Sequence, residues 1–394
     1  MKCLPASKIP QAQGNVLHDW HAEVLAIRSF NRFVLDECRI LAQGSSSELL
    51  RWRASDEAGS ICRRHADAIE AEELGGPESE WDGQSFAWRE DVLLHMYCSE
   101  APCGDASMEL IMEAQEDATP WELPPASLDT PPLSTPEPSA SLPGRAYFSQ
   151  LGVVRRKPAR SDAPPTLSKS CSDKLALRQC ISLLSSITAL LVNPRHVYIH
   201  TLVLPESRYS ESACRRSFSS SHIDGRMRSL ASTEEQKQGE GEGEGKSSYG
   251  FHPFTVETAT SEFTFSQRTV TDIVTNEHGK SGAQKVAASN ISAAWTRSGL
   301  EETTLGGILQ GRKQSAADAR GASFASRRRI WGLAVEIADL LLQRQGIKRA
   351  LGAKTYGGMK DCELLEPRRR AKEQARAEAL KGWVRNLGDE SFNL

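Results

Sequence analysis

Residues 21–42 read HAEVLAIRSFNRFVLDECRILA, a stretch that opens with the triplet His21-Ala22-Glu23. Apolar side chains recur at positions 24, 27, 30, 34, 38 and 41, and this spacing of three or four residues is typical of an amphipathic helix. The sequence therefore predicts a helix that packs on a core and carries a histidine and a glutamate at its start. The triplet alone is weak evidence of a metal site, because it also occurs on ordinary helices.

The second informative segment is Pro102-Cys103-Gly104-Asp105-Ala106-Ser107, where a proline just ahead of a helical pattern marks a helix start. Zinc nucleobase deaminases carry H-x-E followed by P-C-x-x-C, and a catalytic zinc needs three protein ligands and one open position. Ala106 stands where the second cysteine of that pattern would be, so a third ligand must come from elsewhere. Cys171 is the leading candidate, because it too begins an amphipathic pattern and a helix N-terminus favours a thiolate.

Three segments in order, His21-Ala22-Glu23, 102–107 and Ser170-Cys171-Ser172-Asp173-Lys174, resemble the adenosine deaminase domain shared by adenosine deaminases acting on RNA and eukaryotic tRNA-specific adenosine deaminases. The resemblance implies an α/β fold with a cytidine-deaminase-like three-layer core, a mixed central sheet and a helical C-terminal extension. It also implies that His21, Cys103 and Cys171 bind Zn2+, and that Glu23 shuttles protons during hydrolytic deamination of adenosine in RNA.

The tRNA branch of that family is favoured by residues 157–162, Lys-Pro-Ala-Arg-Ser-Asp, which are similar to a K-P-G-R-G-D segment found there. No segment resembles a double-stranded-RNA-binding domain. The resemblance therefore implies conversion of adenosine to inosine at position 37 of alanine tRNA, in the anticodon loop. Three alternatives stay open: an editor of double-stranded RNA, a catalytically inactive zinc-bound RNA-binding protein, and a protein that uses Cys103 as a redox or nucleophilic cysteine.

Editing members of the family bury an inositol hexakisphosphate, which requires a cage of cations and hydrogen-bond donors. The positions that match this cage by resemblance are Arg28, Lys174, Lys313, Tyr356, Lys360 and Trp383. Asp19 resembles an aspartate that relays between the active site and the inositol phosphate. Ile27 and Leu177 depart from the pattern, since editors carry arginine there, so the alternative that these lysines are ordinary surface residues stays open.

The pattern along the chain predicts a single deaminase domain over residues 1–394, interrupted by disordered insertions at 118–144 and 206–248. Helices are expected at 104–114, 171–193, 325–345 and 367–386, and strands at 91–98 and 195–204. Residues 155–162 are a candidate RNA contact, because they are basic and lead into Cys171. The family's domain begins well before the His21 helix, so the first strands are expected to be missing and the domain to be N-terminally incomplete.

Composition excludes several classes of protein. The 394 residues include 48 Lys and Arg against 51 Asp and Glu. This excludes a protein that binds nucleic acid through a large net positive charge, and no DNA partner is expected. No apolar run is long enough to span a bilayer, and we expect no secretory signal. Nine scattered cysteines do not form a secreted disulfide framework. We expect a cytoplasmic or nuclear protein, and the sequence leaves its oligomeric state open.

Overall fold

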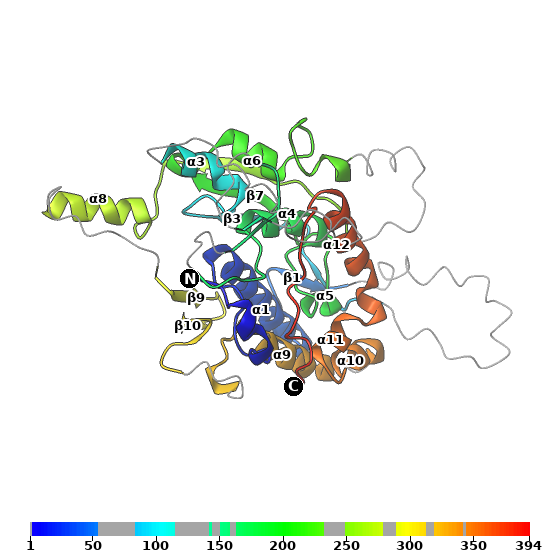
Figure 1. The fold of residues 1–394 in the computed structure, drawn as a ribbon. Helices are drawn as coiled ribbons and strands as arrows, with labels where there is room; N and C mark the ends of the chain where they lie inside the picture. Colours follow the sequence, from blue (N-terminus) through cyan, green and yellow to red (C-terminus); the bar gives the residue numbers. More distant parts are fainter. Residues whose placement is uncertain are drawn as a thin grey trace, which may run out of the picture.

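The computed structural model describes residues 2–53, 83–114, 142–143, 150–157, 163–231, 249–278, 289–312, 319–341 and 344–394. Its helices are α1 (Ala22–Ala42), α3 (Met108–Glu113), α4 (Cys171–Ile181), α5 (Thr188–Leu191), α6 (Glu211–Phe218), α8 (Gln267–His278), α9 (Arg327–Leu340), α10 (Gln345–Leu351), α11 (Tyr356–Lys360) and α12 (Glu366–Glu378) (Figure 1). Its strands are β1 (Leu50–Trp52), β2 (Phe86–Trp88), β3 (Leu94–Tyr97), β4 (Leu142–Pro143), β5 (Arg155–Arg156), β6 (Val192–Asn193), β7 (Ile199–Pro205), β8 (Thr255–Ala259), β9 (Ile291–Trp295), β10 (Glu301–Leu305) and β11 (Ile308–Leu309). None of the helices in these ranges has the length and apolar character that a membrane span requires.

The strands form small separate sheets. β7 lies between β3 and β8, and both pairings are parallel, with Leu202 opposite Met96 on one side and Val256 on the other. β7 is buried along most of its length, as a parallel strand covered on both faces should be. β2 pairs with β1 and β6, and β10 pairs with β9 and β11. The α/β prediction is confirmed, but the described strands do not join into one continuous mixed sheet.

Helix α1 forms where the apolar spacing predicts it. Its residues Val34, Leu35 and Cys38 are buried in the same core as Leu175 of α4 and Trp331 of α9. Burying one such side chain stabilises the fold by about 1.5–3 kcal/mol. The core therefore fixes α1 against α4, and so places the first turns of the two helices relative to each other.

The helix predicted over 171–193 is interrupted: α4 and the short α5 are helical, and the residues between them are not. α4 ends at Ile181, because Ser182 adopts a φ of 64° that no helix continues. Arg178 donates to the carbonyl oxygens of Ser182 and Leu184, at 3.1 Å and 2.9 Å, and satisfies groups that the broken helix leaves unbonded. The apolar pattern continues across this break because the residues after it are also buried, so periodicity could not reveal the break.

The disordered insertion predicted at 206–248 is also wrong in its first part. Residues 206–231 are ordered and include α6, which begins with Ser210 accepting from the N–H of Ala213. Cys214 and Phe218 of α6 and Met227 beyond it join the main core. Residues 232–248, and most of the predicted insertion at 118–144, lie outside the described residues. The Ser-rich composition hid a short helix that is held by a few buried side chains.

The other predicted elements are found with shorter bounds. β3 lies within the predicted strand 91–98, and β7 covers most of 195–204. The helix predicted over 104–114 forms as a short 3₁₀ turn followed by α3. α9 and α12 lie in the two predicted C-terminal helices. Type and order were therefore predicted better than boundaries, as is usual when only periodicity is used.

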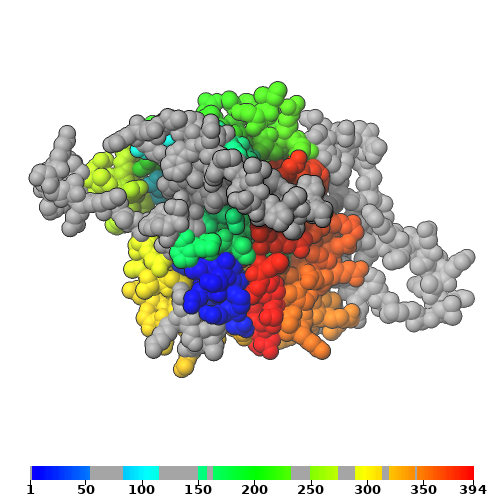
Figure 2. Space-filling view, in the orientation of Figure 1, coloured from blue at the N-terminus to red at the C-terminus, as the bar shows by residue number. Residues whose placement is uncertain are grey.

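The N-terminal and C-terminal segments lie side by side on one face, as the adjoining blue and red surfaces show (Figure 2). Asp389 accepts from the N–H of Gly14 at 2.9 Å and from His18 Nε2 at 2.9 Å. The ring of Phe392 stacks on Tyr356 at 5.0 Å and lies so close to Gly14 that a Cβ there would sit 2.4 Å from it. The last residues therefore hold the loop that leads into α1.

Candidate active site

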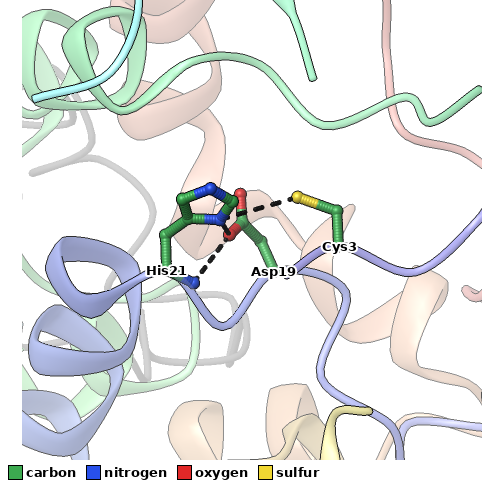
Figure 3. Close-up of side chains that lie close together, drawn as sticks. All are labelled: Cys3, Asp19 and His21. Carbon is green, nitrogen blue, oxygen red and sulfur yellow. Dashed lines mark hydrogen bonds and ion pairs between the residues drawn. The ribbon is translucent and has the colours of Figure 1, made fainter. Parts of the chain in front are cut away.

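His21 is the extended residue that precedes α1, so its side chain lies at the helix N-terminus. Its backbone N–H and its Nδ1 both lie against Oδ1 of Asp19, at 3.0 Å and 2.8 Å, and Cys3 Sγ is 3.7 Å from Nδ1 (Figure 3). Burial opposes the charged ring, but the hydrogen bond that His21 donates to Asp19 and its contact with Cys3 outweigh burial and raise the pKa of His21 to about 9. A carboxylate on Nδ1 is the usual way to present Nε2 to a metal.

Cys103 and Cys171 meet at the start of α4. The backbone N–H of Cys171 lies 3.4 Å from Cys103 Sγ, and the N–H of Ser172 donates to the carbonyl of Cys103 at 3.0 Å. Gly104 permits this approach: its φ is 105°, and a Cβ there would lie 2.3 Å from Ser170 Oγ. The two sequence-distant segments 102–107 and 170–174 are therefore in direct contact.

The two thiols differ in acidity. A hydrogen bond from Cys171 lowers the pKa of Cys103 to about 6, against the opposing effect of burial and with the help of Lys157. Burial and the same hydrogen bond raise the pKa of Cys171. The pair thus contains one thiolate at neutral pH, a donor suited to a soft or borderline cation such as zinc.

The side chains do not place all three predicted ligands within one coordination sphere. Among the described residues, the ligand atoms that lie within 4.8 Å of one another are those of Cys3, Asp19 and His21. This group is a poor cation site, because Asp19 already accepts from the ammonium groups of Lys157 and Lys174. It is better explained as the contact set that orients the His21 ring. The charge of His21 still affects the pKa of Cys103, so the ring lies near the thiols.

Lys157 is the functional residue that the sequence interpretation misplaced. It was a candidate RNA contact, but it is 6% exposed and its Nζ lies 3.1 Å from Cys171 Sγ and 2.9 Å from Asp19 Oδ2. Arg155 is buried as well, so these two side chains of the 155–162 segment do not face an RNA. The resemblance of residues 157–162 to K-P-G-R-G-D drew attention to Lys157. It did not indicate that the side chain points into the protein.

Asp19 joins the thiol site to a second region. Burial would raise its pKa, but Lys157 and Lys174 hold the pKa of Asp19 well below its usual range. Lys174 also donates to Ser168 Oγ at 2.6 Å. A continuous chain of contacts therefore runs from Cys171 through Lys157 and Asp19 to Lys174.

Glu23 lies in the first turn of α1, two residues after His21. Its negative charge opposes ionisation of both thiols, so its carboxylate lies close enough to Cys103 and Cys171 to act on them electrostatically. Glu23 and the thiols therefore belong to one site at the N-termini of α1 and α4.

A second cluster is built almost entirely from cations. Burial and neighbouring cations lower the pKa of Arg178 to about 9 and of Arg28 to about 10, and hold that of Lys372 well below its usual range. The further members of this cationic cluster are Lys169, Lys174, Lys360, Arg368 and Arg376. Arg368 Nε and Arg376 Nε are buried without a hydrogen-bond partner. Such a cluster is unfavourable unless an anion fills it.

Most residues predicted for the inositol phosphate lie around this cationic cluster. Lys360 Nζ lies 5.6 Å from the Tyr356 ring centroid, and Trp383 lies under Lys169 and Arg376. Arg28 donates to the carbonyl of Ala325 at 2.9 Å. Lys313 lies outside the described residues. The sequence did not predict four members of the cluster: Arg178, Arg368, Lys372 and Arg376. A basic helix face is normally interpreted as exposed to solvent, and only its packing shows otherwise.

Comparisons with known proteins identify the relatives of this chain. A model of the adenosine-deaminase (editase) domain matches residues 77–239. The tRNA-specific adenosine deaminase 1 of Schizosaccharomyces pombe is 30% identical over 393 residues, covering 99% of this chain and 82% of that protein. The proteins of the same name from Saccharomyces cerevisiae and Drosophila melanogaster are 30% and 26% identical, and the matches cover 44% and 41% of their lengths. The chain therefore belongs to the adenosine-deaminase (editase) family, together with these tRNA-specific adenosine deaminases.

Proposed function

We propose that this chain is a zinc-dependent deaminase that converts adenosine to inosine in tRNA, at position 37 beside the anticodon of alanine tRNA. The observation that carries the proposal is the meeting of Cys103 and Cys171 at the start of α4, beside Glu23 and His21 at the start of α1. The relatives are tRNA-specific adenosine deaminases, which supports tRNA as the substrate. The small sheets and flanking helices fit a variant of the cytidine-deaminase-like core.

His21, Cys103 and Cys171 are the residues that would hold the zinc. One imidazole and two thiolates with an open fourth position are a known catalytic donor set. The present structure supports this set in two ways: Asp19 holds Nδ1 of His21, and the thiol pair already favours one thiolate. When bound, zinc supplies a water that is activated at neutral pH.

The protein's own groups then have separable tasks. Glu23 accepts a proton from the attacking water and donates it to N1 of the adenine. It then takes the remaining proton from the new C6 hydroxyl and passes it to the departing amino group, which leaves the C6 carbonyl. Oxygen is gained at C6 and ammonia leaves, so adenosine and water give inosine and ammonia. Lys157 keeps positive charge beside Cys171, which compensates the buried negative charge of the thiolates.

We further propose that the cationic cluster binds inositol hexakisphosphate. A polyanion would supply the acceptors that Arg368 Nε and Arg376 Nε lack, and would offset the burial and the mutual repulsion that lower the pKa of Lys372. Lys174 would contact this ligand on one side and Asp19 on the other, so the ligand would be coupled to the thiol site. Phosphorus analysis of the purified, dialysed and then acid-denatured protein tests this assignment.

The proposed function is tested with a substrate panel. The purified chain is incubated with an alanine tRNA carrying A37, the same tRNA carrying G37, and a perfect RNA duplex, and inosine is measured after nuclease digestion. The expected result is inosine only with the A37 tRNA and none with Glu23→Gln. Inosine in the duplex would indicate an editor of double-stranded RNA. Zinc-bound protein that yields no inosine in any substrate would indicate an inactive RNA-binding protein.

A further inference from the structure

Two aspartates occupy equivalent positions in the two cysteine segments. Asp105 follows Cys103 by two residues, and Asp173 follows Cys171 by two residues. Both carboxylates are fully buried, at 0% exposure. A buried carboxylate is costly unless it is paired and hydrogen-bonded, so each must be compensated by its surroundings.

The compensation has the same composition at both sites. Asp105 accepts from Arg216 Nε at 3.0 Å, from Ser217 Oγ at 3.0 Å and from the backbone N–H of Gly152 at 2.8 Å. Asp173 is held by Arg226 Nη1 at 2.6 Å, together with one serine hydroxyl and one backbone N–H. Each aspartate thus receives one arginine, one serine and one amide.

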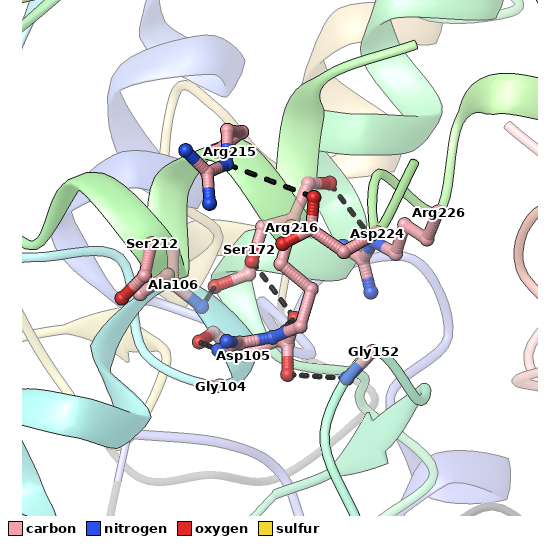
Figure 4. A network of polar contacts seen from close by, with 12 residues as sticks. Gly104, Asp105, Ala106, Gly152, Ser172, Ser212, Arg215, Arg216, Asp224 and Arg226 are labelled. Atoms are coloured by element: carbon pink, nitrogen blue, oxygen red, sulfur yellow. Dashed lines mark hydrogen bonds and ion pairs between the residues drawn. The ribbon is translucent and has the colours of Figure 1, made fainter. Parts of the chain in front are cut away.

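Both arginines come from one stretch of chain. Arg226 donates its backbone N–H to the carbonyl of Arg216 at 3.0 Å and its Nε to the carbonyl of Ser217 at 2.9 Å. Figure 4 shows Arg216 beside Asp105, with Arg226 further along the same segment. Arg216 also donates to Glu109 of α3 at 2.5 Å and 2.9 Å. The two arginines therefore form one unit that contacts both cysteine segments.

We propose that Arg216 and Arg226 are positioning residues that fix the separation and direction of Cys103 and Cys171 through Asp105 and Asp173. The segment 211–226 lies far along the chain from Cys103 and contacts Asp105 and Asp173. Ser172 joins the two cysteine segments directly, by donating to the carbonyl of Cys103. The proposal rests on the proposed zinc chemistry, and it adds residues that neither touch the metal nor touch the substrate.

The test compares Arg216→Gln, Arg226→Gln and the matched control Arg215→Gln. Arg215 lies beside Arg216 on α6, but its ion pairs are long, at 3.6 Å and 3.8 Å, and its side chain is 35% exposed. Zinc release from the loaded, folded protein to a chromophoric chelator is measured well below the melting temperature, together with the visible spectrum of the cobalt-substituted protein. Loss of an outer contact of a metal ligand costs roughly 10- to 100-fold in metal affinity.

The arginines act through Asp105 and Asp173 and do not contact a ligand, so the expected result is zinc release up to about tenfold faster in both variants than in wild type, with a changed cobalt spectrum and no change in Arg215→Gln. If the glutamine variants do not fold, Arg216→Lys and Arg226→Lys keep the charge with fewer hydrogen bonds and should give an intermediate rate. Folded variants with the wild-type release rate and spectrum, even with a lower melting temperature, would overturn the positioning role alone. Wild-type protein that binds no zinc would overturn the proposed function as well.

Discussion

The ammonium nitrogen of Lys157 lies 3.1 Å from the Sγ of Cys171, in a place that solvent barely reaches. The same nitrogen pairs with Asp19, which in turn pairs with Lys174. Burial would lower the pKa of Lys157, but Asp19 and the cysteines hold it well above its usual range. Lys157 therefore remains charged next to the thiol pair, and its charge belongs to the electrostatics of the site.

Replacing Lys157 by methionine should destabilise the protein by about 3–5 kcal/mol, because the substitution leaves the buried carboxylate of Asp19 with one fewer cation. Urea unfolding at neutral pH measures this change. The double variant Lys157→Met with Asp19→Asn should lose less than the sum of the two single variants, since the partners interact directly. Lys8→Met, at an exposed lysine, is the control. Additive losses in the double variant would contradict the coupling.

Gly104→Ala should lower the free energy of unfolding by more than the cost of placing an alanine at a positive φ. Gly104 and Gly44 have φ values of 105° and 88°, but a Cβ at Gly44 meets nothing within 4 Å, whereas a Cβ at Gly104 would overlap Ser170. Gly44→Ala should cost about 1–2 kcal/mol from its backbone conformation. Gly104→Ala should exceed that cost and also weaken zinc binding. Equal unfolding free energies for the two variants would mean that the contact with Ser170 is unimportant.

The contact between His18 and Asp389 predicts a pH dependence of stability. Burial, with help from the charge of Arg327, lowers the pKa of His18 to about 4, so its ring is neutral although it lies beside a carboxylate. Arg327 supplies the positive charge that Asp389 requires. An unfolded histidine has a pKa near ~6.5, so between pH 4 and 6.5 the unfolded chain binds more protons and stability rises with pH.

The contribution of His18 is fully present above about pH 6.5 and is lost as the pH falls towards 4, with a slope of at most about 1.4 kcal/mol per pH unit. Urea unfolding across this range measures the slope. His18→Gln keeps a donor for Asp389 but cannot titrate, so its slope should be smaller by that amount. An unchanged slope in His18→Gln would show that His18 is not the titrating group.

Lys372→Met should have opposite effects with and without a bound polyanion. Without it, the substitution removes an amine whose charged form is disfavoured by burial and by the charges of Arg368, Arg376 and Lys360, and should stabilise the protein. With inositol hexakisphosphate bound, the substitution removes an ion pair and should lower the melting temperature. The exposed Lys381 provides the control variant Lys381→Met. Equal shifts with and without the polyanion would argue against a polyanion site at Lys372.

The sequence was sufficient to predict the elements that follow from a local pattern of apolar residues. The spacing in 21–42 predicted α1, and the apolar run at 195–204 predicted β7. Ser182 could not be predicted to end α4, because the contacts around its positive φ form only in the folded chain: Arg178 donates to the carbonyl of Ser182, and the N–H of Leu183 donates to the carbonyl of Val197. The composition of 206–231 concealed α6 for a similar reason.

The candidate site divides in the same way. The candidate roles of His21, Glu23, Cys103 and Cys171 could be predicted from the sequence, because they follow from the residue types and their motifs. The direction of Lys157, the pairing of Arg216 with Asp105, and the inward face of Arg368 depend on tertiary packing. Long-range ion pairs leave no periodic signal, so a basic or serine-rich segment looks solvated until its partners are placed.

The central claim is that His21, Cys103 and Cys171 hold a zinc ion that this chain needs to convert adenosine to inosine in tRNA. The most direct measurement is the inosine yield on alanine tRNA before and after removal of metal by a chelator, and again after one equivalent of zinc is returned. The account predicts full loss and recovery in wild type, and no recovery in Cys171→Ser. An inosine yield that persists in protein shown by elemental analysis to contain no zinc would contradict it.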